Sequence, residues 1–268
     1  MINAIELKAP FLAQWQNKDP FAEVEQLSGE VYRAVKERRT LNFHLDNRSY
    51  FAKIHHGTTL KEIVKNLISF RLPVLDAKQE WDAIHHLEKA GVHTMNGRAF
   101  GRKGINPLTR TSFIITEDLN PAISLEDFTQ NWLISPPDYA LKRKLIIYLA
   151  KMVSAMHRSG LNHRDCYLCH FLLDLPLFET QKCIKLSVID LHRAQIRKKV
   201  PTRWRDKDLI GLYFSSSKIG ITKKDILLFL KHYFNKPIKT ILQQEHKLIA
   251  NAIKKAERIR YRTEKHKL

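Results

Sequence analysis

The residues best suited to chemistry lie together in segment 162–170, Asn-His-Arg-Asp-Cys-Tyr-Leu-Cys-His. The spacing Cys166-x-x-Cys169-His170 is the pattern of covalent c-type haem attachment. Zinc is a second interpretation, but a structural zinc site needs a second ligand pair, and only the isolated Cys183 follows. A cysteine can also act simply as a small buried hydrophobic side chain. We expect these cysteines to pack around a loop in that way rather than to hold haem or metal.

A third interpretation starts from His163-Arg164-Asp165. In protein kinases, a loop that opens with these residue types places its aspartate to accept or orient the proton of an attacking hydroxyl. Such a loop follows a long helix and precedes two short strands, the second of which leads to another aspartate. Asp190 ends the expected strand over 185–190 and could hold the Mg²⁺ that bridges nucleotide phosphates, although a cap or turn residue is the lesser alternative.

The apolar pattern predicts the elements that must position these residues. The expected elements are a hairpin over 40–54 broken at 46–48, helices over 58–73 and 77–90, a strand over 112–117, a helix over 139–158, strands over 170–173 and 185–190, and helices near 206–216, 222–234 and 238–262. This order predicts an α+β, protein-kinase-like fold of two lobes. A small N-terminal nucleotide-binding lobe with antiparallel sheet and helices is expected over 1–119, and a larger, mainly helical catalytic and acceptor-binding lobe over 120–268.

The N-terminal lobe offers a lysine and a carboxylate of the required kinds. Lys53 lies in the second strand of the hairpin, between apolar residues, where it could pair with nucleotide phosphates. Glu80 lies on the apolar stripe of its helix and therefore needs a cationic partner. Its rival Glu62 lies about 140–160° from the apolar residues of its own helix and should face solvent. Lys53 alone could be an unpaired surface residue, but the order Lys53, Glu80, Asp165, Asp190 favours a site.

Three features depart from the protein-kinase pattern. No G-x-G-x-x-G occurs, and residues 46–48 stand where that loop should lie. His170 occupies the position of an asparagine metal ligand, although Mg²⁺ prefers oxygen. Asp190 is followed by Leu191-His192, and the short stretch before the next helix leaves little room for a regulatory activation loop.

Composition limits the class of protein and of partner. The chain has 268 residues, of which 44% are hydrophobic, so a folded core is expected rather than disorder. It carries 46 Lys and Arg against 27 Asp and Glu, a formal charge of +19, which favours an anionic partner. No export signal and no apolar run near the ~20 residues of a membrane span is found, so a cytoplasmic protein is expected.

A basic stretch lies between Asp190 and Asp208, with Asp206 as its only acid. In a kinase-like fold this stretch borders the acceptor, so an acceptor that bears phosphates and acidic sugars would suit it. The final helix is basic and amphipathic, and could lie on an anionic membrane surface or simply pack by its apolar stripe. The residues expected to bind the acceptor are Arg193, Arg197, Lys198, Lys199 and Arg203.

Longer strings carry a closer resemblance. They are His-Arg-Asp-Cys-Tyr-Leu-Cys-His-Phe-Leu-Leu at 163–173, Val-Ile-Asp-Leu-His-Arg-Ala-Gln at 188–195, residues 203–216, and shorter matches at 74–75, 79–81 and 107–114. Together they resemble the lipopolysaccharide core heptose(I) kinase family over nearly the whole chain. The resemblance implies ATP-dependent phosphorylation of the first heptose of the inner core in a Gram-negative bacterium, at the cytosolic face of the inner membrane. Asp165 matches the family's catalytic aspartate.

The sequence therefore predicts a kinase that uses ATP and Mg²⁺ on a lipopolysaccharide core glycolipid. Asp165 orients the sugar hydroxyl, Asp190 binds Mg²⁺, Lys53 holds phosphate, Glu80 holds Lys53, and the backbone near Glu117 binds adenine. Peripheral contact with the anionic inner membrane is expected, and an acidic protein partner is left open. The alternatives are a nucleic-acid-binding protein, disfavoured because the aromatic residues are not interleaved with the basic runs, and a protein kinase, disfavoured by the short activation segment.

Overall fold

The structure is a computed structural model that describes residues 3–35, 38–57 and 76–265. The chain forms two compact units. The first comprises Met1–His86, Thr94–Asn120 and Asp190–Arg193, and the second comprises Leu87–His93, Pro121–Ile189 and Ala194–Leu268. The helix expected over 58–73, with Glu62, lies outside the described residues.

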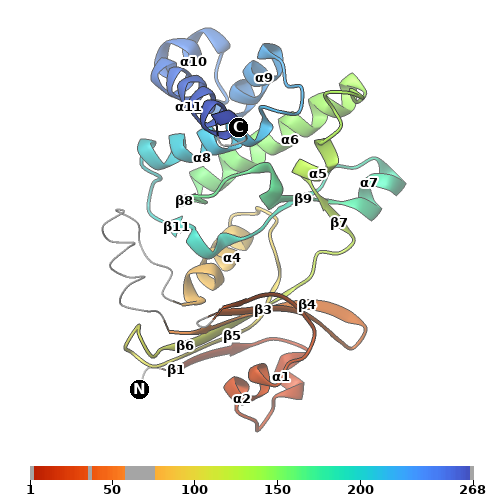
Figure 1. Cartoon of the computed structure of the whole chain (residues 1–268), viewed down its shortest axis with the longest axis vertical. Helices are drawn as coiled ribbons and strands as arrows, with labels where there is room; N and C mark the ends of the chain where they lie inside the picture. The colour runs from red at the N-terminus through yellow and green to blue at the C-terminus, as the bar shows by residue number, and fades with distance from the viewer. Residues whose placement is uncertain (1–2, 36–37, 58–75, 266–268) are drawn as a thin grey trace. The chain divides into compact units, whose positions relative to one another are not determined.

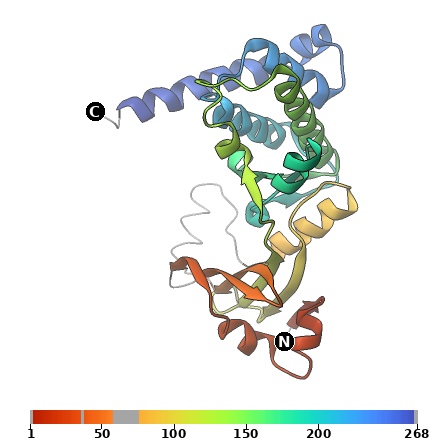
Figure 2. The same cartoon turned by 90° about the vertical axis from the view of Figure 1, so that its right-hand side faces the viewer.

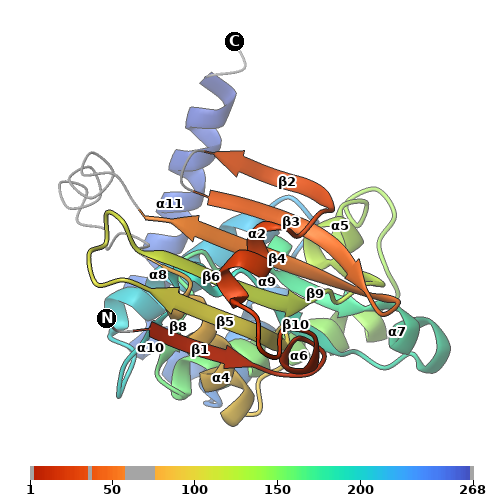
Figure 3. The ribbon, with the colours of Figure 1, turned by 90° about the horizontal axis from the view of Figure 1, so that it is seen from below.

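An antiparallel sheet dominates the first unit. Within the described ranges it has six strands in the order β1-β5-β6-β4-β3-β2, seen from below in Figure 3. The strands are β1 (Asn3–Leu7), β2 (Glu30–Val35), β3 (Arg38–Leu45), β4 (Arg48–His56), β5 (Gly97–Lys103) and β6 (Thr111–Glu117). The expected hairpin and the strand over 112–117 are thus confirmed as β3, β4 and β6.

One face of this sheet is covered by two short helices, α1 (Phe11–Gln14) and α2 (Pro20–Glu25). Alternation in β4 turns Tyr50, Ala52 and Ile54 toward them. The ring of Phe11 meets that of Tyr50 at 5.2 Å in an edge-to-face contact. Because these residues fill the core on one face, the odd-numbered residues of β4 are left for the other face, where Lys53 lies.

The β3–β4 connection is a tight turn. Asp46 and Asn47 both have positive φ, 49° and 60°, which Asp and Asn tolerate better than most residues. Two such residues are typical of the type I′ hairpin, whose twist matches that of the strands. A two-residue turn therefore stands where a protein kinase carries its glycine-rich loop.

Helix α4 (Lys78–Lys89) confirms the helix expected over 77–90. It buries Trp81, Ile84 and Leu87. Trp81 stacks on Phe100 of β5 with ring centroids 5.4 Å apart. This packing fixes the rotation of the first turn of α4 and hence the direction of Glu80.

The second unit is mainly helical (Figure 1). Its helices are α5 (Leu125–Thr129), α6 (Tyr139–Arg158), α7 (Leu175–Gln181), α8 (Thr202–Ser216), α9 (Lys223–Phe234), α10 (Ile238–Gln244) and α11 (His246–Lys265), with a 3₁₀ turn at Leu168–His170. Its short strands are β7 (Ala122–Ser124), β8 (Leu161–Asn162), β9 (Phe171–Asp174), β10 (Leu186–Val188) and β11 (Gln195–Ile196), which form the sheets β10-β9-β7 and β11-β8. The expected α+β architecture, with a sheet-rich unit and a mainly helical unit, is confirmed.

Helix α6 confirms the long helix expected over 139–158. Asp138 caps its first turn by accepting hydrogen bonds from the N–H groups of Ala140 and Leu141. Its buried side is the apolar stripe that includes Leu145, Leu149, Met152, Val153 and Met156. After α6 the chain makes a turn, forms β8 and then enters the loop that carries Asp165.

Three expected boundaries are wrong. The helix expected over 238–262 is two helices, α10 and α11, which are separated at Glu245, and the carboxylate of Glu245 accepts two hydrogen bonds from Arg205 of α8. Helix α8 begins at Thr202 rather than near 206, directly after Pro201, whose ring cannot continue a helix backwards. The strand expected over 185–190 ends at Val188, so Asp190 lies beyond it.

Helix α11 packs along α8, and its C-terminal part extends beyond the other helices of the same unit (Figure 2). Within the part of the chain that the structure describes, no helix combines the length and the apolar character that crossing a membrane requires.

Candidate active site

Lys53 is held by two carboxylates in the first unit. Its Nζ lies 2.7 Å from Oε1 of Glu80 and 3.5 Å from Oδ1 of Asp190. The Glu80 side chain is only 2% exposed, so it is committed to this pair. Burial lowers the pKa of Lys53, but the negative charges of Glu80 and Asp190 outweigh it, and the pKa of Lys53 is raised. The lysine is therefore a fixed cation, as phosphate binding requires.

Asp190 directly precedes a one-turn 3₁₀ helix, Leu191–Arg193, and has a positive φ of 60°. Besides Lys53, its Oδ1 accepts a hydrogen bond of 2.7 Å from Nδ1 of His192. No group of three or more His, Cys, Asp or Glu side chains poised for a metal occurs among the described residues.

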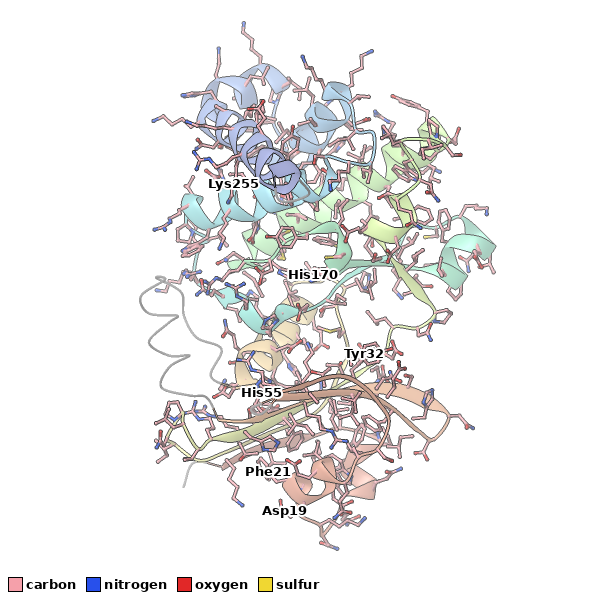
Figure 4. The ribbon with its side chains drawn as sticks, in the orientation of Figure 1. Asp19, Phe21, Tyr32, His55, His170 and Lys255 are labelled. Atoms are coloured by element: carbon pink, nitrogen blue, oxygen red, sulfur yellow. The ribbon has the colours of Figure 1, made fainter. Side chains whose placement is uncertain are left out.

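His55 lies two residues after Lys53 on the same strand. Figure 4 shows it on the face of the sheet opposite to Phe21 of α2. Burial, together with the positive charges of Arg38 and Lys53, lowers the pKa of His55 to about 3. The imidazole is therefore neutral at physiological pH and adds no charge beside Lys53.

Asp165 lies in a loop whose backbone is anchored by Asp208 of α8. The N–H groups of His163 and Arg164 donate to the Asp208 carboxylate at 2.7 and 2.8 Å, and Nε2 of His157 donates at 3.2 Å. Asp208 is 1% exposed. The two peptides that precede Asp165 are thereby fixed. The anchoring role of Asp208 was not predicted from the sequence, where this residue only marks the end of the basic stretch. The apolar residues 209–210 that follow it were the available sign that Asp208 is buried.

Asp208→Ala should therefore destabilise the second unit strongly. Two buried peptide N–H groups would lose their acceptor, and each such loss costs about 1–3 kcal/mol. We expect the free energy of unfolding to fall by about 3 kcal/mol or more, as measured by urea denaturation. Asp206→Ala, which removes a half-buried acid from the same helix, is the matched control, and an equal loss in the two variants would contradict the anchoring role.

Two histidines brace the same loop. His163 donates from Nε2 to the carbonyl of Ile189 at 2.9 Å, and His170 donates from Nδ1 to the carbonyl of Asp165 at 2.7 Å. Their rings stack with centroids 5.4 Å apart and planes within 6°. His170, labelled in Figure 4, thus holds the main chain of Asp165. The contact positions the loop, and this role of His170 was not predicted from the sequence.

Glu117 is the last residue of β6, and its carboxylate contacts side chains on the neighbouring segment 96–98. The carboxylate lies 2.7 Å from both Nδ2 of Asn96 and NH2 of Arg98. The Glu117 N–H donates to the Asn96 carbonyl, and the Asp118 N–H donates to the Ser49 carbonyl. These two N–H groups are therefore already engaged in hydrogen bonds within the first unit.

The predicted acceptor residues fall in both units. Arg193 belongs to the first, in the turn after Asp190. Arg197, Lys198, Lys199 and Arg203 belong to the second, where the two lysines and Arg203 are exposed and Arg197 is half-buried.

The three cysteines are free thiols: Cys166 is buried, Cys169 half-buried and Cys183 exposed. Burial, with a smaller contribution from the charge of Asp208, raises the pKa of Cys166 well above its ordinary value. A thiol so disfavoured as thiolate is a poor metal ligand.

Cys166→Ala combined with Cys169→Ala should accordingly keep activity detectable. We expect metal analysis of the wild-type protein to give no stoichiometric zinc, and its spectrum to show no haem band. Zinc at one per chain, lost in the double variant, would overturn the packing role.

These features define a class. A β-strand lysine paired with a helix glutamate, a following His-Arg-Asp loop and an aspartate after the next strand are the parts with which a protein-kinase-like phosphotransferase works.

The comparisons narrow the class to a family. The model of the lipopolysaccharide kinase (Kdo/WaaP) family matches residues 22–233. "Lipopolysaccharide core heptose(I) kinase WaaP" of Escherichia coli is 60% identical over 259 residues, 97% of this chain and 98% of the relative. The protein of that name from Pseudomonas aeruginosa is 49% identical over 97% of each chain. The chain belongs to the lipopolysaccharide kinase (Kdo/WaaP) family.

A solved structure agrees with this membership. The structure described as "WaaP in complex with acyl carrier protein" is 46% identical and superposes with a TM-score of 0.85 over 95% of this chain and 98% of that one.

Proposed function

We propose that this protein transfers the terminal phosphoryl group of ATP to a hydroxyl of the first heptose of the lipopolysaccharide inner core. The observation that carries the proposal is near full-length identity of 49–60% to relatives named heptose(I) kinase. The charge arrangement at Lys53 suits it, because phosphoryl transfer depends on positioning and on neutralising phosphate charge.

In the proposed first lobe, residues 1–119, Lys53 holds nucleotide phosphates, and Glu80 holds Lys53. Asp190 supplies a carboxylate to Mg²⁺, which when bound neutralises charge on the transferring phosphoryl group. His192 keeps that carboxylate oriented through its 2.7 Å hydrogen bond. Adenine donates a hydrogen bond to the backbone carbonyl of Glu117, since the N–H groups of Glu117 and Asp118 are already engaged.

In the proposed second lobe, residues 120–268, Asp165 orients the acceptor hydroxyl and takes its proton as the O–P bond forms. Asp208 and His170 keep the loop in place through contacts to its backbone. Arg193, Arg197, Lys198, Lys199 and Arg203 attract the anionic glycolipid.

An acidic protein of the acyl-carrier type is the proposed partner, at the cytoplasmic face of the inner membrane. Support comes from the 46% identical WaaP, which was solved with acyl carrier protein. Helix α11 offers exposed Lys254, Lys255 and Arg258, and Figure 4 labels Lys255. Its charge would also favour peripheral contact with anionic lipid.

Reversing two of these charges should break the partner contact. Lys254→Glu with Lys255→Glu is expected to abolish co-elution of acyl carrier protein in gel filtration, because like charges would then face each other. Lys223→Glu with Lys224→Glu, two exposed lysines at the start of α9, is the matched control. Co-elution that survives both pairs of changes would place the partner elsewhere.

ATP turnover tests the function. Purified protein should consume ATP with intact core glycolipid and with its delipidated oligosaccharide, and should not respond to RNA or to a generic protein substrate. Turnover that requires RNA or protein, with no response to the core oligosaccharide, would refute the proposal.

A further inference from the structure

Four cations of the second unit surround one indole ring. The guanidinium carbons of Arg164, Arg203 and Arg197 lie 5.3, 5.4 and 6.0 Å from the centroid of Trp204, and Nζ of Lys207 lies at 5.4 Å. We call these five residues the Trp204 cation cluster. A ring face attracts one cation, but four brought together repel one another.

Arg197 is fixed in the cluster by neutral groups. Its NH1 donates to Oδ1 of Asn162 at 2.6 Å, and its NH2 donates to Oε1 of Gln195. Its backbone N–H donates to the Gly160 carbonyl. Both side-chain acceptors are amides, so the guanidinium is held in place without its charge being neutralised by them.

The adjacent Arg205 shows the contrast. Its guanidinium makes a bidentate contact with Glu245, at 3.0 and 2.6 Å, and also binds Asp206. The hydrogen-bond acceptors of Arg205 are therefore carboxylates, which neutralise its charge, whereas the side-chain acceptors of Arg197 are neutral amides. A preorganised cation with amide partners is what a site for an external oxyanion needs.

The N-terminal end of α8 lies at the Trp204 cation cluster, because Arg203 and Trp204 belong to the first turn of this helix. This 15-residue helix starts after Pro201, which gives no side-chain cap, and its first turn holds no acid. The first-turn N–H groups and the positive end of the helix dipole favour an anion at this place. The positive potential of these backbone groups is independent of the side-chain charges and adds to their attraction for an anion.

Arg164 connects the cluster to the chemistry. It directly precedes Asp165, and its own peptide N–H is held by Asp208. Arg164 is itself only 4% exposed, so it adds its charge from beneath the ring of Trp204. An oxyanion bound at the exposed Arg203 would therefore lie beside the loop that carries the residue proposed to orient the acceptor hydroxyl.

We propose that the Trp204 cation cluster is the acceptor's anion subsite, where a carboxylate or phosphate of the core glycolipid is bound. This inference rests on the proposed function and deepens it: among the basic residues, Arg197, Arg203 and Lys207 contact a specific oxyanion, and the buried Arg164 adds its positive charge. Lys198 and Lys199, which are exposed, contribute only long-range attraction.

The test measures binding of delipidated core oligosaccharide to the full chain by calorimetry, without ATP. Arg203→Gln with Lys207→Gln should weaken binding by about tenfold or more, because a hydrogen bond to a charged group contributes about 1.5–3 kcal/mol. Lys198→Gln with Lys199→Gln removes the same charge from the same stretch and is the matched control. We expect the control pair to change affinity far less, and only at low salt.

Two modified ligands identify the oxyanion. Carboxyl-reduced oligosaccharide that loses affinity assigns a sugar carboxylate, and dephosphorylated oligosaccharide that loses affinity assigns a phosphate. Equal binding of all three forms, or equal losses in the two double variants, would overturn the inference. Phosphorylation is assayed separately: oligosaccharide that binds to the cluster but is never phosphorylated would refute the proposed function and leave the anion subsite standing.

Discussion

Asp165→Ala should lower kcat by roughly 10²–10⁴-fold, the usual contribution of a positioned general base. The loop should keep its shape, because its anchors are backbone contacts to Asp208 and His170 rather than the Asp165 side chain. ATP affinity, measured by titration, and the melting temperature should therefore stay near the wild-type values. A variant with wild-type kcat would show that this loop is not catalytic, and a large fall in melting temperature would show that Asp165 is structural.

Lys53 and Glu80 should behave as one unit in a double-mutant cycle. Lys53→Met and Glu80→Gln should each lower kcat/KM for ATP by more than about tenfold, because the first leaves the buried Glu80 charge uncompensated and the second removes the nearer of the two carboxylates that hold Lys53. The double variant should be little worse than either single variant, with a coupling energy of about 0.5–3 kcal/mol. Steady-state kinetics of the four proteins measures it.

An exposed ion pair in the same helix provides the control. Lys78 and Asp82 are joined one turn apart on α4, and both side chains are 45% exposed. Surface pairs of this kind contribute about 0.3–0.5 kcal/mol. Their cycle should leave ATP kinetics unchanged. Additive effects of Lys53→Met and Glu80→Gln would mean that the 2.7 Å contact does not support nucleotide binding.

Periodicity predicted the Lys53–Glu80 contact because both signals are local. A strand side chain alternates with its neighbours, and a helix carboxylate on an apolar face needs a cation. The structure indeed brings together Lys53, Glu80 and Asp190. Their roles toward ATP stay predictions.

Other features depend on distant residues and could not be obtained from periodicity. Asp208 anchors a loop more than forty residues before it in the sequence, and Glu245, which lies between α10 and α11, binds the distant Arg205. The first strand and the helices α1 and α2 were missed because each is too short to show a period. The 58–73 helix, with Glu62, lies outside the described residues and stays a prediction.

Phosphorylation of the first heptose through Asp165 is tested directly by locating the product. Core oligosaccharide lacking that phosphate should be incubated with ATP and the wild-type protein, and the product located by mass spectrometry and ³¹P–¹H correlation NMR. We expect one added phosphate on the first heptose with the wild-type protein, and almost none with Asp165→Ala. A phosphate on any other sugar, or equal product from both proteins, would contradict it.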